Sequence, residues 1–271
     1  MKRLSASVVA LSLNAASLLV SSASVMAQQQ EDGDIRNPQC NPANLVNGFG
    51  RCNYGEDFSY FGYYENGLPN GRGTLTLEDG TRYDGEFRDG RPNGDGRLIM
   101  PDDVRYEGTF REGSIVRGAA FFANGDRYQG SFTQVPNTTT ETEEYPAFNN
   151  ETGQVEIQQI AFFVTFYSSQ PDGIGQYIFT NGNRYEGEFF SGQPFGLGTF
   201  IHSSGTVCDG YFFTRNMDGR NATCNYPNGD SYVGELRQGR PHGTGTMIKA
   251  DGTTISGAFR DGQPVSYSGY Q

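Results

Sequence analysis

A short glycine-containing pattern, Tyr-x-Gly-x-Phe followed by Gly and then Gly-x-Gly, returns eight times along the chain. Its clearest copy contains Tyr83, Gly85, Phe87, Gly94 and Gly96. The copies start about 23 residues apart, except for one step of 57 residues. Repetition at a fixed period predicts a stack of similar small units in place of a single globular core.

The repeat can be followed by its leading residue, which is tyrosine in most copies. The glycine two positions later is present in every copy. The eight leading residues are Tyr60, Tyr83, Tyr106, Tyr128, Tyr185, Cys208, Tyr232 and Ile255. Upstream, Gly48 and Gly50 keep the spacing of a Gly-x-Gly pair, which predicts a half-repeat that caps the N-terminal end of the stack.

Each copy predicts a β-hairpin. Tyr, Gly and Phe at alternate positions fall on one face of a strand. Turn signals such as Asp89-Gly90 lie inside the copies, and others such as Asp79-Gly80 lie between them. We expect the rings of each hairpin to cover the glycine of its neighbour and to form a continuous ladder. The predicted fold class is all-β, an elongated, twisted antiparallel sheet of stacked hairpins.

These residues resemble the membrane occupation and recognition nexus (MORN) repeat family. The resemblance covers residues 48–132 and 171–264. In other proteins such repeats serve as interaction scaffolds, or as appendages on enzymes such as lipid kinases and lysine methyltransferases. The rest of this chain has no room for a catalytic domain of either kind. The resemblance therefore implies a scaffold that acts by binding.

The first 27 residues have the features of a signal peptide. Lys2 and Arg3 precede an apolar stretch over residues 4–20, and Val25-Met26-Ala27 fits a small-residue cleavage site. A membrane anchor is the alternative, although the stretch is short and contains Ser and Asn. We expect export to the periplasm or the medium.

The four cysteines form two close pairs, Cys40 with Cys52 and Cys208 with Cys224. An even number of cysteines in an exported chain predicts two disulfides. Three connectivities are possible, and proximity favours the local one. In that arrangement a cross-strand bond at Cys208 replaces a tyrosine of the ladder. Metal binding is the alternative, but the spacings match no zinc motif.

Acidic residues outnumber basic ones, with 31 Asp and Glu against 20 Lys and Arg, and the net charge is −11. This balance opposes nucleic-acid binding and weakens the case for an anionic lipid surface. Arginines and carboxylates recur around the Tyr-x-Gly motif. They indicate either cross-strand ion pairs on a solvated face or a charged groove for a partner.

An insertion at residues 135–170 interrupts the fourth copy. The acidic stretch 133–144 is expected to be a mobile loop, and the aromatic stretch 155–167 is expected to be a strand. That strand supplies the candidate partner-binding residues Phe162, Phe163, Phe166 and Tyr167. The alternatives are an extension of the sheet, a flap over the ladder, or a strand for partner binding or self-association.

The predicted organisation is a signal peptide (1–27), an N-terminal segment with a capping half-repeat (28–59), repeats (60–134), the insertion (135–170), and repeats with a C-terminal cap (171–271). No catalytic, cofactor-binding or metal-binding residues are predicted. The predicted function is a non-enzymatic exported scaffold that binds another envelope or extracellular protein. Association with a phospholipid surface is the alternative, and polysaccharide binding is a weaker one.

Overall fold

A computed structural model describes residues 39–54, 58–149 and 154–265. The described chain is entirely β-structure and turns, and none of it forms a helix that could cross a membrane. The strands are β1 (Gln39–Asn41), β2 (Gly48–Tyr54), β3 (Phe58–Glu65), β4 (Leu68–Leu77), β5 (Arg82–Arg88), β6 (Arg91–Ile99), β7 (Arg105–Arg111), β8 (Ser114–Phe121), β9 (Arg127–Asn149), β10 (Gln154–Ile178), β11 (Arg184–Phe190), β12 (Gln193–Ile201), β13 (Val207–Phe212), β14 (Gly219–Asn225), β15 (Ser231–Arg237), β16 (Arg240–Ile248), β17 (Thr254–Arg260) and β18 (Gln263–Pro264).

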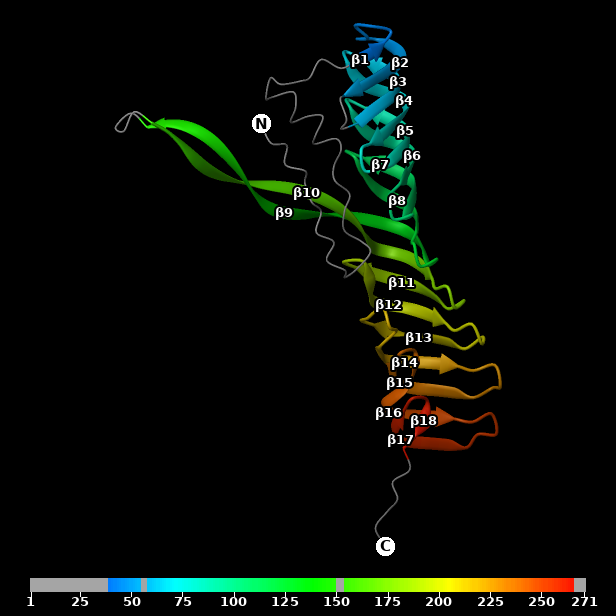
Figure 1. Cartoon of the computed structure of the whole chain (residues 1–271). Helices are drawn as coiled ribbons and strands as arrows, with labels where there is room; N and C mark the ends of the chain where they lie inside the picture. The colour runs from blue at the N-terminus through cyan, green and yellow to red at the C-terminus, as the bar shows by residue number, and fades with distance from the viewer. Residues whose placement is uncertain (1–38, 55–57, 150–153, 266–271) are drawn as a thin grey trace.

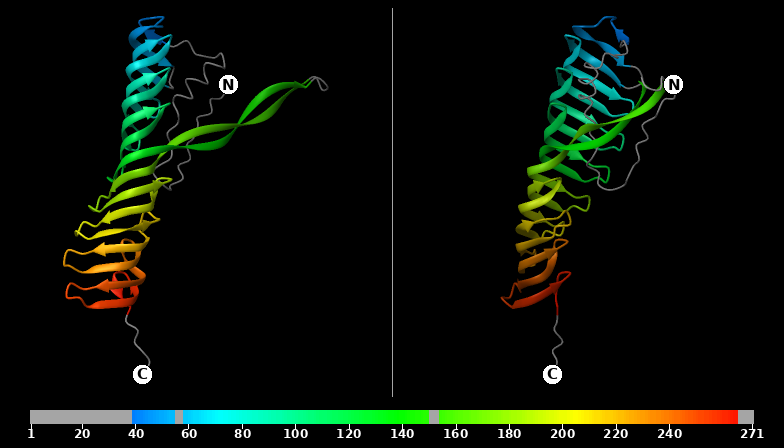
Figure 2. Two further views of the ribbon diagram at one scale, coloured as in Figure 1. Left: turned by 180° about the vertical axis from the view of Figure 1, so that it is seen from behind. Right: turned by 90° about the vertical axis from the view of Figure 1, so that its left-hand side faces the viewer.

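Every strand pairs antiparallel with the next strand along the chain, from β1 with β2 to β17 with β18. The eight sequence copies are the hairpins that run from β3–β4 to β17–β18, and β2 precedes them. Figures 1 and 2 show one long, twisted stack that runs from the N-terminal to the C-terminal hairpin. The predicted fold class is confirmed.

Two kinds of turn alternate along the stack. Inside a hairpin both turn residues have positive φ, as at Asp89 (48°) and Gly90 (77°), which is the type I′ geometry that matches the twist of paired strands. Between hairpins the glycine has positive φ, as at Gly80 (89°), whose N–H donates to the Leu77 carbonyl at 3.1 Å. Asp103 (63°) occupies that glycine position in the next repeat.

Neighbouring hairpin turns are joined by hydrogen bonds that the sequence analysis did not predict. The turn N–H of Gly90 donates to the Pro69 carbonyl of the preceding repeat at 2.9 Å, and that of Gly113 donates to Pro92 at 3.0 Å. Proline suits this position because its carbonyl is used while its missing N–H is not needed. These bonds hold the type I′ turns of successive hairpins in register.

The predicted aromatic ladder lines one face of the sheet, here called the inner face. The Tyr83 ring centroid lies 5.1 Å from that of Phe87 in its own repeat and 4.9 Å from that of Phe110 in the next repeat. Tyr60 likewise lies 4.8 Å from Phe87. These edge-to-face contacts bury rings of one repeat against rings of the next. The hydrophobic packing of each repeat therefore depends on its neighbour.

The position of the tyrosine differs from the expectation. We expected each ring to cover the glycine of a neighbouring repeat, but Tyr83 covers the glycine pair of its own hairpin. A Cβ added at Gly85 would lie 2.5 Å from the Tyr83 hydroxyl, and one added at Gly96 would lie 2.6 Å from ring atom Cε2. The hydroxyl donates to the Glu86 carbonyl at 3.2 Å, so the buried polar group is satisfied.

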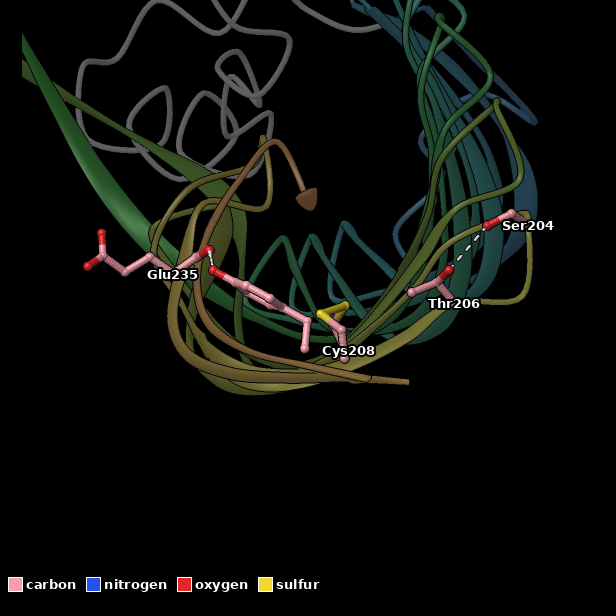
Figure 3. The surroundings of a disulfide bond; sticks show 6 residues. Ser204, Thr206, Cys208 and Glu235 are labelled. Carbon is pink, nitrogen blue, oxygen red and sulfur yellow. Dashed lines mark hydrogen bonds between the residues drawn. A yellow bond between two sulfur atoms is a disulfide. The ribbon is translucent and has the colours of Figure 1, made fainter. Parts of the chain in front are cut away.

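The sheet is curved into an open trough. In Figure 3 the view runs along the stack, and the disulfide at Cys208 lies on the inside of the curve. The side chains of the other face, here called the outer face, point away from the trough, as Glu235 does in the same view. The ladder therefore fills the concave side and leaves the convex side to solvent.

The insertion extends the fourth hairpin as two paired strands, and the expected strand at residues 155–167 is confirmed as part of β10. The expectation of a mobile loop at residues 133–144 is wrong, because this stretch belongs to β9 and pairs residue by residue with β10. The pairing of Thr133 with Gln170 matches that of Arg88 with Arg91 beside an ordinary two-residue turn. The two strands continue from there as a ribbon, here called the arm (residues 133–149 and 154–170).

The arm leaves the stack and does not lie over the ladder as a flap (Figures 1 and 2). It contains seventeen consecutive residue pairs, from Thr133 with Gln170 to Asn149 with Gln154. At ~3.3 Å per residue, the arm is roughly 55 Å long. Its strong twist is typical of a two-stranded ribbon.

The substitution Gly96→Ala tests the glycine pair. Its Cβ would overlap the Tyr83 ring, so we expect it to lower the free energy of unfolding by about 3 kcal/mol. The control is Gly96→Ala in a Tyr83→Leu background, where no ring covers the glycine pair and the added methyl group should cost much less. Thermal unfolding followed by circular dichroism measures the loss in each background. Equal losses in the two backgrounds would show that the Tyr83 ring is not the reason for the glycine.

Alkaline pH is expected to unfold the stack through the ladder tyrosines. Burial raises the pKa of Tyr106, Tyr185 and Tyr232 to about 12, whereas an unfolded tyrosine titrates near ~10. The unfolded state therefore loses these protons first. Stability is fully present below pH ~10 and falls as the pH rises toward ~12.

Phenolate absorbance and circular dichroism, recorded together from about pH 8 to pH 13, measure this loss. Ladder tyrosines that ionise near pH 10 while the β-signal persists would contradict it. A return to pH 8 serves as the control for reversibility.

Candidate binding surfaces

Both predicted disulfides are present, with the predicted local pairing. Cys40 in β1 is bonded to Cys52 in β2 with an S–S distance of 2.04 Å, and Cys208 in β13 is bonded to Cys224 in β14 at 2.07 Å. In each case the two cysteines are direct cross-strand partners. Two disulfides indicate folding in an oxidising compartment.

The Cys208–Cys224 bond fills the place of a missing ladder tyrosine, as predicted. Cys208 and Cys224 are fully buried, in line with the rings of neighbouring repeats. Ala222 stands where most repeats have the second glycine of the Gly-x-Gly pair, and it is fully buried. A Cβ is tolerated here because no tyrosine ring occupies the space.

The candidate partner-binding residues lie in the arm portion of β10. The register pairs Phe162 with Glu141, Phe163 with Thr140, Phe166 with Asn137 and Tyr167 with Pro136. The acidic and the aromatic stretches of the insertion are therefore the two strands of one ribbon. Partner binding by these four residues remains a prediction.

The arm has free backbone edges along most of its length. β9 pairs with β8 only over 127–131, and β10 pairs with β11 only over 173–178. Beyond these base segments, the two arm strands pair with each other and with no other described strand. Each outer edge therefore presents backbone N–H and C=O groups with no strand partner among the described residues.

The repeated charges lie on the outer face, where three arginine–carboxylate pairs join residues of the same strand and Arg97 lies 4.0 Å from its cross-strand partner Glu107. Arg82 contacts Asp84 at 2.8 Å, and Arg184 contacts Glu186 at 2.9 Å, in each case two positions along the strand. The hydrogen bond from Arg82 is the main reason that the pKa of Asp84 lies below its ordinary value. Such exposed pairs contribute little to stability, about 0–1 kcal/mol each.

Three exposed aromatic residues interrupt this charged face near the N-terminal end of the stack. Phe49, Phe61 and Tyr63 have exposed fractions of 51%, 42% and 54%. The Phe49 ring centroid lies 4.8 Å from that of Phe61 and 5.1 Å from that of Tyr63, and the Arg51 guanidinium lies 5.1 Å from the Phe61 ring centre.

These three rings form one wall of an open groove of about 550 Å³, here called the outer groove. It continues over the backbone of Gly73, Gly85 and Gly96, and its polar lining is Arg72, Thr74, Asp84, Asp95 and Arg97. The sequence analysis did not identify this surface. A signal was present, because Phe49 is the middle residue of the first Gly-x-Gly, where later copies have Arg72 and Asp95.

A second exposed apolar group lies on the fifth hairpin. Phe190, Phe195 and Leu197 are exposed, and the two phenylalanine rings are 6.0 Å apart. Phe195 also lies 5.9 Å from Tyr211 of the next repeat. This group provides a comparison surface of similar chemistry at a different level of the stack.

The two histidines do not form a catalytic arrangement with each other. The Nδ1 atom of His202 lies 2.7 Å from the Ser204 hydroxyl within a surface turn, and His242 lies in β16 of another repeat, 3.9 Å from Asp261. In the part of the chain that the structure describes, no group of three or more His, Cys, Asp or Glu residues is placed to hold a metal ion.

A family model described as "MORN repeat" matches residues 60–82, 83–105, 165–184, 185–207 and 232–254. The chain contains five MORN repeats. The copies outside the match depart most from the pattern, including those that begin at Cys208 and Ile255. A MORN-repeat stack is a scaffold of a kind that often binds proteins or membranes.

No curated protein matches the chain in sequence. Among solved structures, the SAS-4 (dCPAP) TCP domain in complex with a proline-rich motif of Ana2 (dSTIL) of Drosophila melanogaster is 12% identical, with 71% of this chain and 88% of that chain covered and a TM-score of 0.35. The microcephaly protein CPAP G-box domain is 11% identical, with 69% and 98% covered and a TM-score of 0.14. Scores this low support no inference about fold or function.

Removal of the Cys208–Cys224 bond is expected to destabilise the stack at the sixth repeat. The double variant Cys208→Ser, Cys224→Ser should lower the free energy of unfolding by about 3 kcal/mol, because the closed loop no longer restricts the unfolded chain. The triple variant Cys208→Tyr, Ala222→Gly, Cys224→Leu rebuilds the ordinary ladder and should recover part of the loss.

Thermal unfolding of the oxidised proteins measures the difference between these variants. A double variant as stable as the natural chain would show that the Cys208–Cys224 bond does not contribute the stability that a ladder tyrosine gives in other repeats. A triple variant no more stable than the double variant would show that the tyrosine and the disulfide are not equivalent at this position.

Proposed function

We propose that the chain is an exported, non-enzymatic scaffold that binds a partner protein of the cell envelope or the extracellular space through its arm. The observation that carries the proposal is the pair of free backbone edges along the arm. An exposed strand edge is a template on which a strand of another chain can add.

The β10 edge is the better candidate for this addition. Residues 157–168 contain no charged side chain and include Phe162, Phe163, Phe166 and Tyr167. The β9 strand carries Glu141, Glu143 and Glu144, and charge on an edge strand opposes the addition of another strand. An incoming strand on β10 would gain backbone hydrogen bonds and contacts with an aromatic-rich neighbour.

Two features support export. The disulfides require an oxidising compartment, and the sequence of the first 27 residues has the features of a signal peptide. Residues 1–38 lie outside the described part of the structure. Together these features favour a partner in the envelope or outside the cell, and the acidity of the chain favours a protein partner over an anionic lipid surface.

The test replaces the arm with an ordinary turn. Residues 134–169 are exchanged for Asp-Gly, so that Thr133 and Gln170 flank a type I′ turn as Arg88 and Arg91 do. Affinity capture from envelope extract with residues 28–271 should yield a partner that the armless chain does not retain. Phe163→Lys with Tyr167→Lys should also lose it, whereas Phe195→Lys on the outer face should keep it.

Equal capture by the natural and the armless chains would overturn the assignment of the arm. Thermal unfolding of the armless chain provides the control, since its repeats should remain folded. Capture that depends on phospholipid vesicles and is abolished by salt would favour the membrane alternative instead.

A further inference from the structure

We propose that the outer groove binds a neutral oligosaccharide or polysaccharide chain, with Phe49, Phe61 and Tyr63 as its stacking platform. This site lies on the repeats β2–β6 and is separate from the arm. It is also on the opposite face of the sheet from the buried ladder, so its aromatic residues are not needed for the packing of the trough.

The aromatic end of the groove is suited to a sugar ring. Phe49, Phe61 and Tyr63 are about half exposed, whereas the ladder tyrosines and phenylalanines are almost fully buried. A pyranose has an apolar C–H face that packs on an aromatic ring, and the Arg51 guanidinium, which lies over the Phe61 ring, adds hydrogen-bond donors at this end of the groove. A cluster of exposed aromatic residues on a charged face is otherwise unfavourable to leave in water.

The rest of the groove offers both donors and acceptors. The Arg72 and Arg97 guanidinium groups donate hydrogen bonds, and the Asp95 carboxylate accepts one from Thr109 at 3.2 Å and has further acceptor capacity. Arg97 is only loosely paired, at 4.0 Å from Glu107. A chain of hydroxyl groups, each both a donor and an acceptor, matches this mixture.

The charge distribution argues against a strongly charged ligand. The lining holds two arginines, Arg72 and Arg97, and two carboxylates, Asp84 and Asp95, and Asp84 is already paired with Arg82. A polyanion would meet Asp95, and a polycation would meet the arginines. A neutral ligand avoids both costs.

The direction of the groove supports a linear polymer. The groove crosses the strands from β2 to β6 and so runs along the stack, where two strands per repeat give a period of ~9.6 Å. This period is close to the length of a disaccharide unit in an extended β-linked glycan. The floor of the groove is the backbone of a line of glycines whose side-chain positions face the ladder, so no side chain projects there toward a ligand.

The same line continues farther along the stack. A second hollow of about 360 Å³ lies over Gly118, Gly130 and Gly175, and its lining includes Arg117, Gln129 and Gln176. These side chains again combine donors and acceptors. A long polysaccharide could therefore contact the outer face at both levels.

A polyproline peptide is the main competing ligand, because its three-residue turn of ~9.3 Å has a similar period. Such peptides dock between repeated aromatic ridges. Here the aromatic residues end at Tyr63, and the groove continues with Arg72 and Asp95, so the observations favour the sugar. A proline-rich peptide is included in the test for this reason.

The experiment titrates the purified full chain with cellohexaose, hexa-N-acetylchitohexaose, polygalacturonate and a decaproline peptide, by calorimetry. We expect binding of at least one of the two neutral sugars and none of polygalacturonate or the peptide. The double variant Phe61→Ala, Tyr63→Ala should weaken sugar binding at least about tenfold, and Arg72→Ala should weaken it less. The matched control Phe190→Ala, Phe195→Ala removes an exposed aromatic pair elsewhere on the stack and should bind as the natural chain does.

Three results would overturn the proposal: no binding of either neutral sugar, unchanged binding by the Phe61→Ala, Tyr63→Ala variant, or binding of decaproline that this variant loses. The last result would assign the groove to a peptide. Because Phe61 and Tyr63 are exposed, the variant should keep the circular dichroism spectrum and Tm of the natural chain, and this control separates loss of the site from loss of the fold. The armless chain should bind the sugar normally, so the outcome does not depend on the role of the arm.

Discussion

The contact between a tyrosine ring and the glycine pair of its own hairpin sets the geometry of the whole stack. Tyr83 lies over Gly85 and Gly96, and its hydroxyl is held by the carbonyl of Glu86. This position leaves one edge of the ring free to meet Phe110 of the next repeat. The glycines are therefore required by close packing, in addition to the backbone conformation that turn glycines supply. Where the ring is absent, at Cys208, a disulfide and Ala222 occupy the same space.

This arrangement explains where the chain can carry an insertion. Packing in the ladder restricts which residues can occupy the inner face. In most hairpins the turn is also held by a hydrogen bond to the preceding repeat, such as the one from the Gly90 N–H to the Pro69 carbonyl. At the fourth hairpin the strands simply continue past the turn position, because the pairing of Thr133 with Gln170 already has the register of a hairpin. Lengthening both strands there leaves the ladder contact of Tyr128 with Phe189 intact, at 4.9 Å. The arm is thus added without disturbing the packing beneath it.

The sequence predicts the features that depend on local, repeated chemistry. The hairpins, the type I′ turns, the ladder and both disulfides follow from residues that recur at a fixed period or lie close together. The acidic stretch 133–144 was expected to be a loop because of its composition, but pairing with the aromatic strand of β10 overrides that local preference. The outer groove had no periodic signal, because Phe49, Phe61 and Tyr63 stand at positions that differ from copy to copy. The glycine that each ring covers could not be inferred from spacing alone, since both strands of a hairpin carry one.

The packing of the two faces indicates which positions in such a stack are free to acquire binding residues. The inner face is fully used by the ladder, and a substitution there removes contacts from two repeats at once. The outer face carries exposed ion pairs of small energy, such as Arg82 with Asp84, so residues there can change with little loss of stability. Phe49, Phe61 and Tyr63 stand at outer-face positions that hold other residues in other copies of the repeat. The exposed phenylalanines of the fifth hairpin do so as well. A stack with a separate arm (Figure 1) therefore presents these exposed groups at separate positions along the chain.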